Sequence, residues 1–209
     1  MTCSNNPEQP DNVGEENIVR EKSTKVSAWL IPSGKSFGIL QTEINRLSTV
    51  HNTPSFEPHV TLFGGVQITE SNIPEVILKL QERFRGFGPI PCNINRSKGI
   101  MTGYDEEKKK VIWNQSTVIA LEKDDKFMKA ARSVRAILLG REGNDKDVLF
   151  KPPLSEPHLS LAYCNEALSP LVELIPEDFD SLEMKLVATD PSTLEGVTNW
   201  VEVGKIPLS

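Results

Sequence analysis

Two of the three histidines in the chain lie in copies of one six-residue sequence. The first copy is Glu57-Pro58-His59-Val60-Thr61-Leu62, and the second is Glu156-Pro157-His158-Leu159-Ser160-Leu161. Four positions are identical, and the other two exchange similar residues. A match of this quality is expected by chance in only about one chain in a thousand of this size, so an internal duplication is the better explanation.

The two copies have the side-chain alternation of half-buried strands. In an extended chain successive side chains point to opposite faces. His59 therefore shares a face with Thr61, and His158 shares the equivalent face with Ser160, while the apolar residues lie on the other face. A pair of buried structural histidines is the alternative interpretation, but their equivalent positions favour a functional pair that meets across one cleft.

Two imidazoles in one cleft suit general acid-base chemistry. Imidazole titrates near neutrality, so one ring can take a proton while the other gives one. The hydroxyls of Thr61 and Ser160, on the same faces, can donate hydrogen bonds to a ligand. The near symmetry of the motifs does not decide which histidine is the base, and the preference for His158 is slight.

Length and charge limit the classes of function. The 209 residues suffice for one domain or for two small lobes with a shared core. A composition of 38% hydrophobic and 25% charged residues is ordinary for a soluble globular protein. The net charge of -6 and the pI near 5.2 disfavour a protein that grips long nucleic acid. A small anionic ligand is compatible with a locally positive cleft.

The cysteines and the apolar runs indicate the compartment. Cys3, Cys92 and Cys164 are odd in number and widely spaced, which supports neither a disulfide framework nor a zinc site. A reducing environment is the default for such a chain. No apolar run is long enough to cross a bilayer, and the first residues are polar. We therefore expect a soluble, cytoplasmic protein without membrane contact.

The pattern along the chain predicts a mobile tail and one domain. Residues 1–24 have almost no apolar periodicity and are predicted to be a disordered N-terminal tail. Residues 25–209 are predicted to form a single domain of two lobes, roughly 25–105 and 110–209, between which strands can be exchanged. The charged stretch 104–110 is the expected boundary.

Each half is predicted to contain a strand, a helix, a histidine strand, a second helix and a further strand. The expected elements are a strand at 25–31, a helix from Ser36 that ends before Pro54, the first histidine strand ending at Gly64-Gly65, a helix from Pro74 to Gly86, strands at 90–100 and 111–121, a helix from Asp124 to Gly140, a surface loop at 141–151, the second histidine strand, a short helix at 168–175, and strands at 182–188 and 197–206.

The paired His-apolar-hydroxyl-apolar motifs resemble those of the two-histidine (2H) phosphoesterase superfamily. Trp29 in the first strand, Glu-Pro-His at 57–59, the run 158–163 and the stretch 189–201 are similar to its plant and fungal cyclic nucleotide phosphodiesterase branch. The resemblance covers roughly residues 25 to 206. The chain departs from the family at Phe63-Gly64-Gly65, where a longer apolar continuation is expected, so the local loop shape is open to question.

This resemblance implies a fold, a reaction and a set of site residues. The fold is α+β, a bilobal duplication in which two antiparallel sheets face a central cleft with helices outside, as in LigT-like proteins. The reaction is metal-independent and needs no cofactor: hydrolysis of 2′,3′-cyclic nucleotides to nucleoside 2′-phosphates, or of ADP-ribose 1″,2″-cyclic phosphate. The implied residues are His59 and His158 as catalytic groups, Thr61 and Ser160 as phosphate-binding groups, and Trp29 and Tyr163 as nucleotide contacts that could equally be core residues.

Other functions remain as alternatives. An RNA-end 2′,3′-cyclic phosphodiesterase is disfavoured by the acidic balance and by the lack of a basic, aromatic-rich surface. A non-catalytic 2H module that only binds a nucleotide is disfavoured because both motifs are intact. A metal phosphodiesterase lacks the spacing His-x-x-x-His, and Cys164 has only its place beside the second motif to suggest a nucleophile. The expected partner is a small cyclic nucleotide, and the protein is expected to be a monomer.

Overall fold

The structure is a computed structural model that describes residues 21–141, 157–169 and 172–208. Within these ranges it combines antiparallel strands with three α-helices. The helices are α1 (Gly34–His51), α2 (Ile73–Phe84) and α3 (Asp125–Leu138), with 3-10 turns η1 (Glu70–Asn72), η2 (Trp113–Gln115) and η3 (Val197–Asn199). The strands are β1 (Ser23–Pro32), β2 (Val60–Thr69), β3 (Ile90–Cys92), β4 (Ile100–Met101), β5 (Tyr104–Asp105), β6 (Lys110–Val111), β7 (Thr117–Ala120), β8 (His158–Ala162), β9 (Phe179–Ala188) and β10 (Val201–Pro207).

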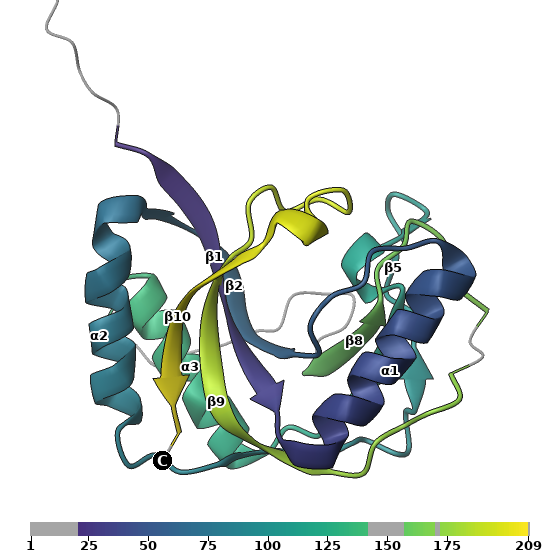
Figure 1. The fold of residues 1–209 in the computed structure, drawn as a ribbon, viewed down its shortest axis with the longest axis horizontal. Coiled ribbons are helices and arrows are strands. Elements are labelled where there is room, and N and C mark those ends of the chain that lie inside the picture. The colour runs from purple at the N-terminus through teal and green to yellow at the C-terminus, as the bar shows by residue number, and fades with distance from the viewer. Residues whose placement is uncertain (1–20, 142–156, 170–171, 209) are drawn as a thin grey trace, which may run out of the picture.

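The strands form one sheet with two arms. Its order is β10-β9-β1-β2-β8-β7-β4, with β3 paired to β9, and β5 and β6 form a separate hairpin. The arms meet where β2 and β8 pair, at Val60 opposite Leu159 (Figure 1). The predicted α+β fold is confirmed, with the refinement that the two sheets are hydrogen-bonded into one. β9, from late in the chain, pairs with β1 from its start, and β10 pairs with the other edge of β9.

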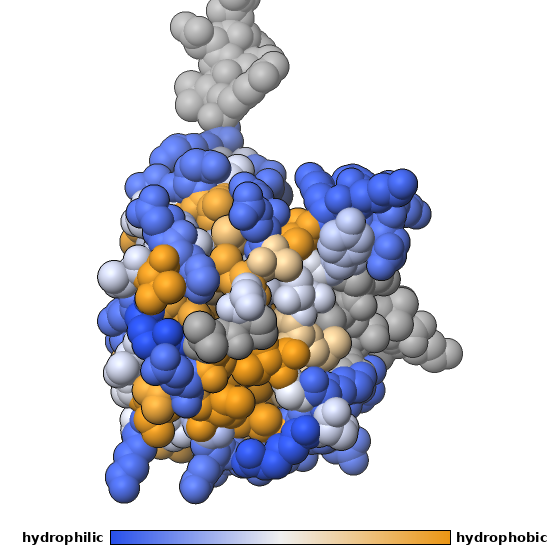
Figure 2. Space-filling model, turned by 90° about the vertical axis from the view of Figure 1, so that its right-hand side faces the viewer, coloured by the Kyte–Doolittle hydropathy of each residue, from blue (hydrophilic) through white to orange (hydrophobic). Residues whose placement is uncertain are grey.

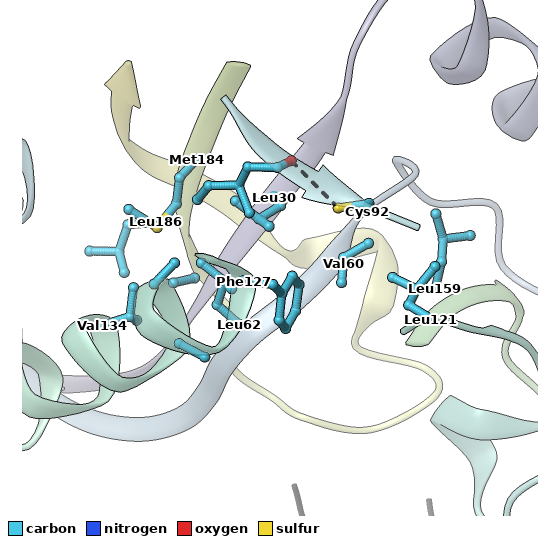
Figure 3. Packing of buried hydrophobic residues seen from close by; sticks show 14 of the residues in the cluster. Leu30, Val60, Leu62, Cys92, Leu121, Phe127, Val134, Leu159, Met184 and Leu186 are labelled. Carbon is cyan, nitrogen blue, oxygen red and sulfur yellow. Dashed lines mark hydrogen bonds between the residues drawn. The ribbon is translucent and has the colours of Figure 1, made fainter. Parts of the chain in front are cut away.

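The helices cover one face of the larger arm. In β1 the side chains of Val26, Ala28 and Leu30 are fully buried and belong to the main core, with Leu80 of α2 and Phe127 of α3. Their alternation with Trp29 and Ile31 follows from the two-residue period of a strand. Figure 3 shows this core, in which Val60 and Leu159 from the two arms both take part. The opposite face of the sheet is left for the candidate site.

Helix α1 packs on the smaller arm, beside β8, as Figure 1 shows. Its buried residues Leu40, Ile44 and Leu47 follow the three-and-four spacing of an amphipathic helix, as predicted. Helix α3 begins where Asp124 accepts hydrogen bonds from the backbone N–H groups of Lys126 and Phe127. A side-chain acceptor of this kind satisfies donors that the first helical turn leaves unpaired.

The first histidine strand does not end at Gly64-Gly65, so that prediction is wrong. β2 continues to Thr69 because the two glycines bend the strand without ending it. Gly65 has a φ of 73°, which favours glycine, and the register with β1 shifts beside Ser27. A Cβ on Gly64 would overlap the side chain of Ser27, so the backbones approach closely here. This is where the chain departs from the apolar pattern of the family that it resembles.

Three predicted strands are shorter than expected. The stretch 90–100 is divided into β3 and β4, because the side chain of Asn95 accepts hydrogen bonds from the backbone of Lys98 and the hydroxyl of Ser97 and forms a turn. The stretch 111–121 is a strand only at β7, since the 3-10 turn η2 comes before it. The last strand likewise begins at Val201, after η3.

The short helix predicted at 168–175 is wrong for the described residues of that stretch, which have no helical structure. The backbone N–H of Glu173 donates instead to Oε1 of Glu43 in α1, over 3.0 Å. Glu43 is fully buried and also pairs with Arg46, so this polar group holds the segment against α1. The predicted loop at 141–151 lies outside the described residues except for Arg141, and so does the predicted tail apart from its last four residues.

The described surface is mixed. Figure 2, which views the side that carries α1 and β5 in Figure 1, shows hydrophilic residues around an apolar area. In the described part of the chain, no helix is both long and apolar enough to cross a membrane. Cys92 is buried in the core, where burial raises the pKa of its thiol to about 12, and Cys164 is half-buried; neither forms a disulfide.

Candidate active site

The two repeated motifs lie side by side on the face of the sheet opposite the helices. Val60 pairs with Leu159 in antiparallel register. Extending this register by one residue in each direction places His59 opposite Ser160 and Thr61 opposite His158. The motifs are thus related by an approximate twofold axis through the Val60–Leu159 pair. Residues diagonal to each other across such a pair have separations of about 7–8 Å, so both imidazoles can reach one small group between them.

Neighbouring strands extend this arrangement across the sheet. Trp29 of β1 lies opposite Thr61, Lys185 of β9 lies opposite Trp29, and on the other arm Ala120 of β7 lies opposite His158. Directly opposed residues share a face, so one row of the sheet carries an indole, a hydroxyl and an imidazole in order. The site therefore lies where the two arms meet.

His59 has a fixed orientation. Its ring is stacked on Trp29, with ring centroids 3.7 Å apart and planes 12° apart. Nδ1 lies 2.7 Å from the backbone carbonyl oxygen of Glu57, which can only accept, so Nδ1 carries a proton. In the neutral ring Nε2 is then an acceptor, and the hydroxyl of Tyr163 donates to it over 3.3 Å. The geometry selects one tautomer of His59.

Burial keeps His59 uncharged at neutral pH. The residue is only 4% exposed. Burial lowers the pKa of His59 to about 4, although the hydrogen bond to Glu57 opposes this and the nearby His158 adds a small further decrease. The contribution from His158 also indicates that the two imidazoles are close enough to interact electrostatically. His158 itself is half-buried.

The two hydroxyl residues differ in exposure. Thr61 is half-buried on the site face, whereas Ser160 is buried. The hydroxyl of Ser160 donates to the backbone carbonyl of Asn114 over 3.0 Å. Ser160 must therefore rotate before it can donate to a ligand, whereas nothing described requires this of Thr61.

Aromatic residues from both arms gather around the site: Trp29 and Phe56 contact the ring of His59, and Trp113 and Trp200 both contact Tyr163. Trp113 of η2 and Trp200, just after η3, are half-buried and have ring centroids 6.2 Å apart. Trp200 also lies 5.8 Å from Trp29 and 6.1 Å from Tyr163. Sequence analysis missed Trp113 as a site residue and noted Trp200 only as part of the family resemblance.

The two aromatic residues predicted to contact a nucleotide are both at the site but are buried. Trp29 is 6% exposed and covers one face of the His59 ring. Tyr163 is 3% exposed, and its ring stacks on Phe56 with centroids 3.9 Å apart. Burial strongly raises the pKa of the Tyr163 hydroxyl, which therefore stays protonated as a donor to His59. Trp113 and Trp200 present more surface to a ligand.

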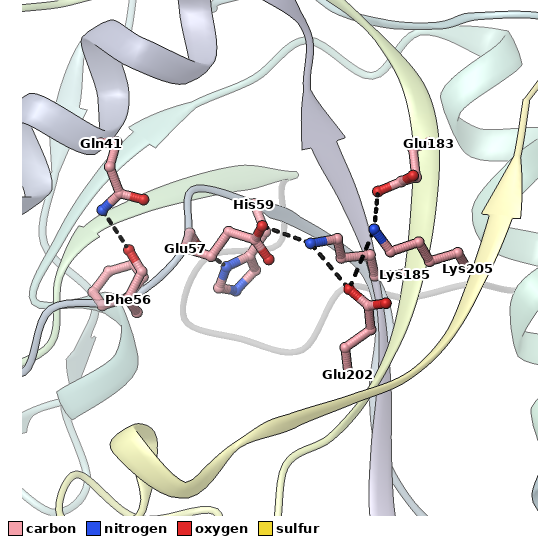
Figure 4. A network of polar contacts seen from close by, with 8 residues as sticks. All are labelled: Gln41, Phe56, Glu57, His59, Glu183, Lys185, Glu202 and Lys205. Carbon is pink, nitrogen blue, oxygen red and sulfur yellow. Dashed lines mark hydrogen bonds and ion pairs between the residues drawn. The ribbon is translucent and has the colours of Figure 1, made fainter.

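An ion-pair network borders the site (Figure 4). Nζ of Lys185 lies 2.6 Å from Oε1 of Glu57 and 3.1 Å from Oε2 of Glu202. Lys205 lies beyond, 3.8 Å from Glu202 and 3.9 Å from Glu183. Figure 4 shows Glu57 between His59 and Lys185, so the network reaches the first histidine motif. Sequence analysis did not find it, although the repetition of Glu in both motifs was a signal.

Two other kinds of chemistry are less well supported by the geometry. The spacing Gly-x-Ser-x-Gly occurs at Gly34–Gly38, but Ser36 lies within helix α1 and is not among the residues with positive φ, so it is not the strained turn of a serine hydrolase. Among the described residues, no three His, Cys, Asp or Glu side chains gather in a group that could hold a metal ion.

A family comparison identifies the chain. The model of the cyclic phosphodiesterase-like protein family matches residues 24–183. The chain belongs to this family. The match spans both histidine motifs, and it confirms the predicted place in the two-histidine phosphoesterase superfamily, in its cyclic phosphodiesterase branch.

Similar proteins agree with this family. The 2′,3′-cyclic-nucleotide 3′-phosphodiesterase of Kluyveromyces lactis is 28% identical over 143 residues, which cover 66% of this chain and 63% of that protein. Among solved structures, TT0787 of Thermus thermophilus has a TM-score of 0.58 at 16% identity and covers 88% of this chain and 97% of its own. LigT of Escherichia coli, complexed with 3′-AMP, has a TM-score of 0.51 at 14% identity; the match covers 90% of this chain and 98% of that chain. These structures support the two-histidine phosphoesterase fold.

Proposed function

We propose that this member of the cyclic phosphodiesterase-like family hydrolyses 2′,3′-cyclic nucleotides to nucleoside 2′-phosphates by paired-histidine acid-base catalysis. The observation that carries the proposal is the placement of His59 and His158 on one face of the sheet, each directly opposite the hydroxyl residue of the other motif. The name of the Kluyveromyces lactis relative specifies cleavage on the 3′ side, which supports the 2′-phosphate as the product.

The surroundings of the histidines support His59 as the base, in contrast to the slight preference for His158 from sequence. A base must be unprotonated at the working pH, and burial keeps His59 in that state. Its Nδ1–H is held by Glu57, so Nε2 carries the lone pair, and a water molecule reaches that lone pair when the Tyr163 hydroxyl, which donates to it, turns away. His158, on the other strand, is then the acid.

The proposed reaction is a single displacement at phosphorus. Water attacks, its proton passes to Nε2 of His59, and a P–O bond to the water oxygen forms while the bond to the ribose 3′ oxygen breaks. His158 gives a proton to that leaving oxygen. Thr61, and Ser160 after rotation, donate hydrogen bonds to the nonbridging oxygens. Proton exchange with solvent then restores both histidines.

The aromatic surroundings support a nucleotide as the substrate. Trp113 and Trp200 come from opposite sides of the site and are its most exposed rings, so they are the surfaces on which a base can stack. Such stacking tolerates any base, because every base has a π-face. We therefore propose activity on cyclic mononucleotides with little preference among the bases.

Product analysis tests this proposal. Purified protein is mixed with each 2′,3′-cyclic mononucleotide, with ADP-ribose 1″,2″-cyclic phosphate and with a short RNA that ends in a cyclic phosphate, and phosphorus NMR follows ring opening. We expect nucleoside 2′-phosphates from the mononucleotides, at the same rate in excess EDTA. The RNA is expected to react more slowly, because the chain is acidic overall.

Each other outcome has a definite meaning. Ring opening of only ADP-ribose cyclic phosphate would replace the proposed substrate by that alternative. Faster opening of the RNA would identify an RNA-end enzyme. Binding of cyclic nucleotides without any ring opening would identify a binding module. Loss of activity in EDTA would overturn the metal-independent mechanism.

A further inference from the structure

The carboxylate at the start of the first motif has no role in the reaction described so far. Glu57 is followed by Pro58 and His59, and its side chain turns to strand β9, where Oε1 lies 2.6 Å from Nζ of Lys185. Strand β1 lies between β9 and β2, so this ion pair spans a strand. It joins the catalytic motif to a strand that is not its direct neighbour.

Lys185 is held firmly in this position. Its side chain is only 11% exposed, and Glu202 contacts it from β10 at 3.1 Å. Burial opposes its charge, but the hydrogen bonds to Glu57 and Glu202 raise the pKa of Lys185 above its usual value, so it remains a cation. A short, charge-assisted contact with little exposure restricts Glu57 more than a solvated surface pair does.

The same glutamate also fixes the catalytic imidazole. The backbone carbonyl of Glu57 accepts a hydrogen bond from Nδ1–H of His59 at 2.7 Å, and this contact selects the tautomer in which Nε2 carries the lone pair. A carbonyl can only orient a ring if its own residue is held in place. The residue that holds Glu57 from outside the motif is Lys185 (Figure 4).

We propose that Lys185 is a positioning residue for His59: through its ion pair with Glu57 it fixes the carbonyl that sets the tautomer and orientation of the catalytic ring. This inference rests on the proposed function, because it assigns a task to a base that the reaction uses. It also gives a role to the glutamate that begins the first motif.

The test distinguishes the loss of the link between Lys185 and Glu57 from a change in the net charge beside His59. K185M/E202Q removes one positive and one negative charge, so the net charge beside His59 is unchanged while the link to Glu57 is lost. K205M/E202Q removes the same carboxylate and another lysine but keeps Lys185 on Glu57, and it is the matched control. Ring opening of a cyclic mononucleotide gives kcat and KM, and nitrogen NMR of His59 at pH 7 reports its tautomer.

We expect K185M/E202Q to lower kcat by about tenfold to a hundredfold with a smaller change in KM, because misplacing a catalytic group acts on the chemical step. Its His59 signals should become those of mixed tautomers. K205M/E202Q should retain kcat within about twofold and the single Nδ1–H tautomer. K185R, which preserves the ion pair, should keep most of the activity.

Two results would overturn the proposal. One is a single Nδ1–H tautomer of His59 in K185M/E202Q together with wild-type kcat. The other is an equal loss in K205M/E202Q, which would indicate an effect of Glu202 alone. If K185M/E202Q does not fold, K185R and E57Q replace it, and wild-type kcat with an unchanged tautomer in E57Q has the same meaning. If wild-type protein opens no cyclic phosphate, the proposed function fails, whereas the NMR result still decides whether Lys185 positions His59.

Discussion

The two copies of the repeated hexapeptide differ more in their surroundings than in their sequences. The imidazole of His59 is buried, stacked on Trp29 and fixed by a backbone carbonyl, whereas His158 is half-buried. Burial lowers the pKa of His59 to about 4. Duplication therefore supplies two similar groups, and the packing around each copy makes one of them suited to accept a proton. Such a difference distinguishes the two rings, because a ring that is neutral at the working pH is the one able to accept a proton.

The largest expected effect comes from removing either imidazole. We expect His59→Ala and His158→Ala each to lower kcat for ring opening by about 10²- to 10⁴-fold, since each ring moves a proton in the transition state. His51→Ala is the matched control, because His51 lies at the end of α1 outside both motifs and should leave the rate unchanged. Near-normal turnover in either motif variant, with folding verified by circular dichroism, would remove the paired mechanism.

Removing the hydroxyls of the two motifs should also have unequal effects on kcat, and smaller ones than removing the imidazoles. Thr61→Ala is expected to lower kcat by about 10²- to 10³-fold, the usual effect of losing a donor to a developing oxyanion. Ser160→Ala should lower it less, because its hydroxyl already donates to the carbonyl of Asn114. Steady-state kinetics on one cyclic mononucleotide measures both. An equal or greater loss in the serine variant would mean that the two motifs bind phosphate alike.

Stability against pH tests the difference between the histidines without any substrate. The pKa of His59 is about 4 in the folded protein and about 6.5 when unfolded, so the unfolded chain binds more protons in between. The contribution of His59 to the free energy of unfolding is therefore complete above pH 6.5 and is lost as the pH falls towards 4. Between pH 8 and 5 we expect a loss of about 2 kcal/mol in the free energy of unfolding.

Variants assign this loss to one histidine. Urea unfolding of His59→Gln should lack this pH-dependent loss, and His158→Gln should retain it. The same low pKa places the acid limb of kcat against pH below 6.5. A pH dependence of unfolding that is unaltered in the His59 variant would contradict the burial of a neutral ring at that position.

The smallest expected effect concerns Tyr163. Its hydroxyl donates to Nε2 of His59 over 3.3 Å, a long hydrogen bond. Tyr163→Phe keeps the ring on Phe56, and we expect a two- to tenfold change in kcat, in line with the modest net energy of about 0.5–1.5 kcal/mol for one such bond. A loss comparable to that of His59→Ala would instead make the hydroxyl part of the proton transfer.

Much of the fold was predictable because the spacing of apolar residues along the sequence indicates which face of a helix or strand is buried. The spacing of Leu40, Ile44 and Leu47 predicted α1, and the hydrogen-bonding side chain of Asp124 predicted where α3 begins. The helix predicted at 168–175 is wrong because the backbone N–H of Glu173 donates to the buried carboxylate of Glu43 on another element. This long-range contact cannot be predicted from the local sequence. Gly64 and Gly65 were misjudged because a glycine pair marks a bulge as readily as a strand end.

The candidate site was predictable only in part. The repeat gave His59, Thr61, His158 and Ser160, and the structure places them on one face. The environment of each histidine depends on residues from distant elements, such as Trp200 and Lys185, whose approach depends on strand order. Sequence could therefore name the candidate reacting groups but not the difference between their surroundings.

The contact between Val60 and Leu159 links the packing of the interior to the reaction. These two side chains lie in the core, and the residues on either side of each of them are the imidazoles and hydroxyls of the site. A bulkier side chain at either position would spread the two strands and move the two motifs apart. Under the proposed function, the size of these two interior residues is therefore constrained by the dimensions of a phosphate ester.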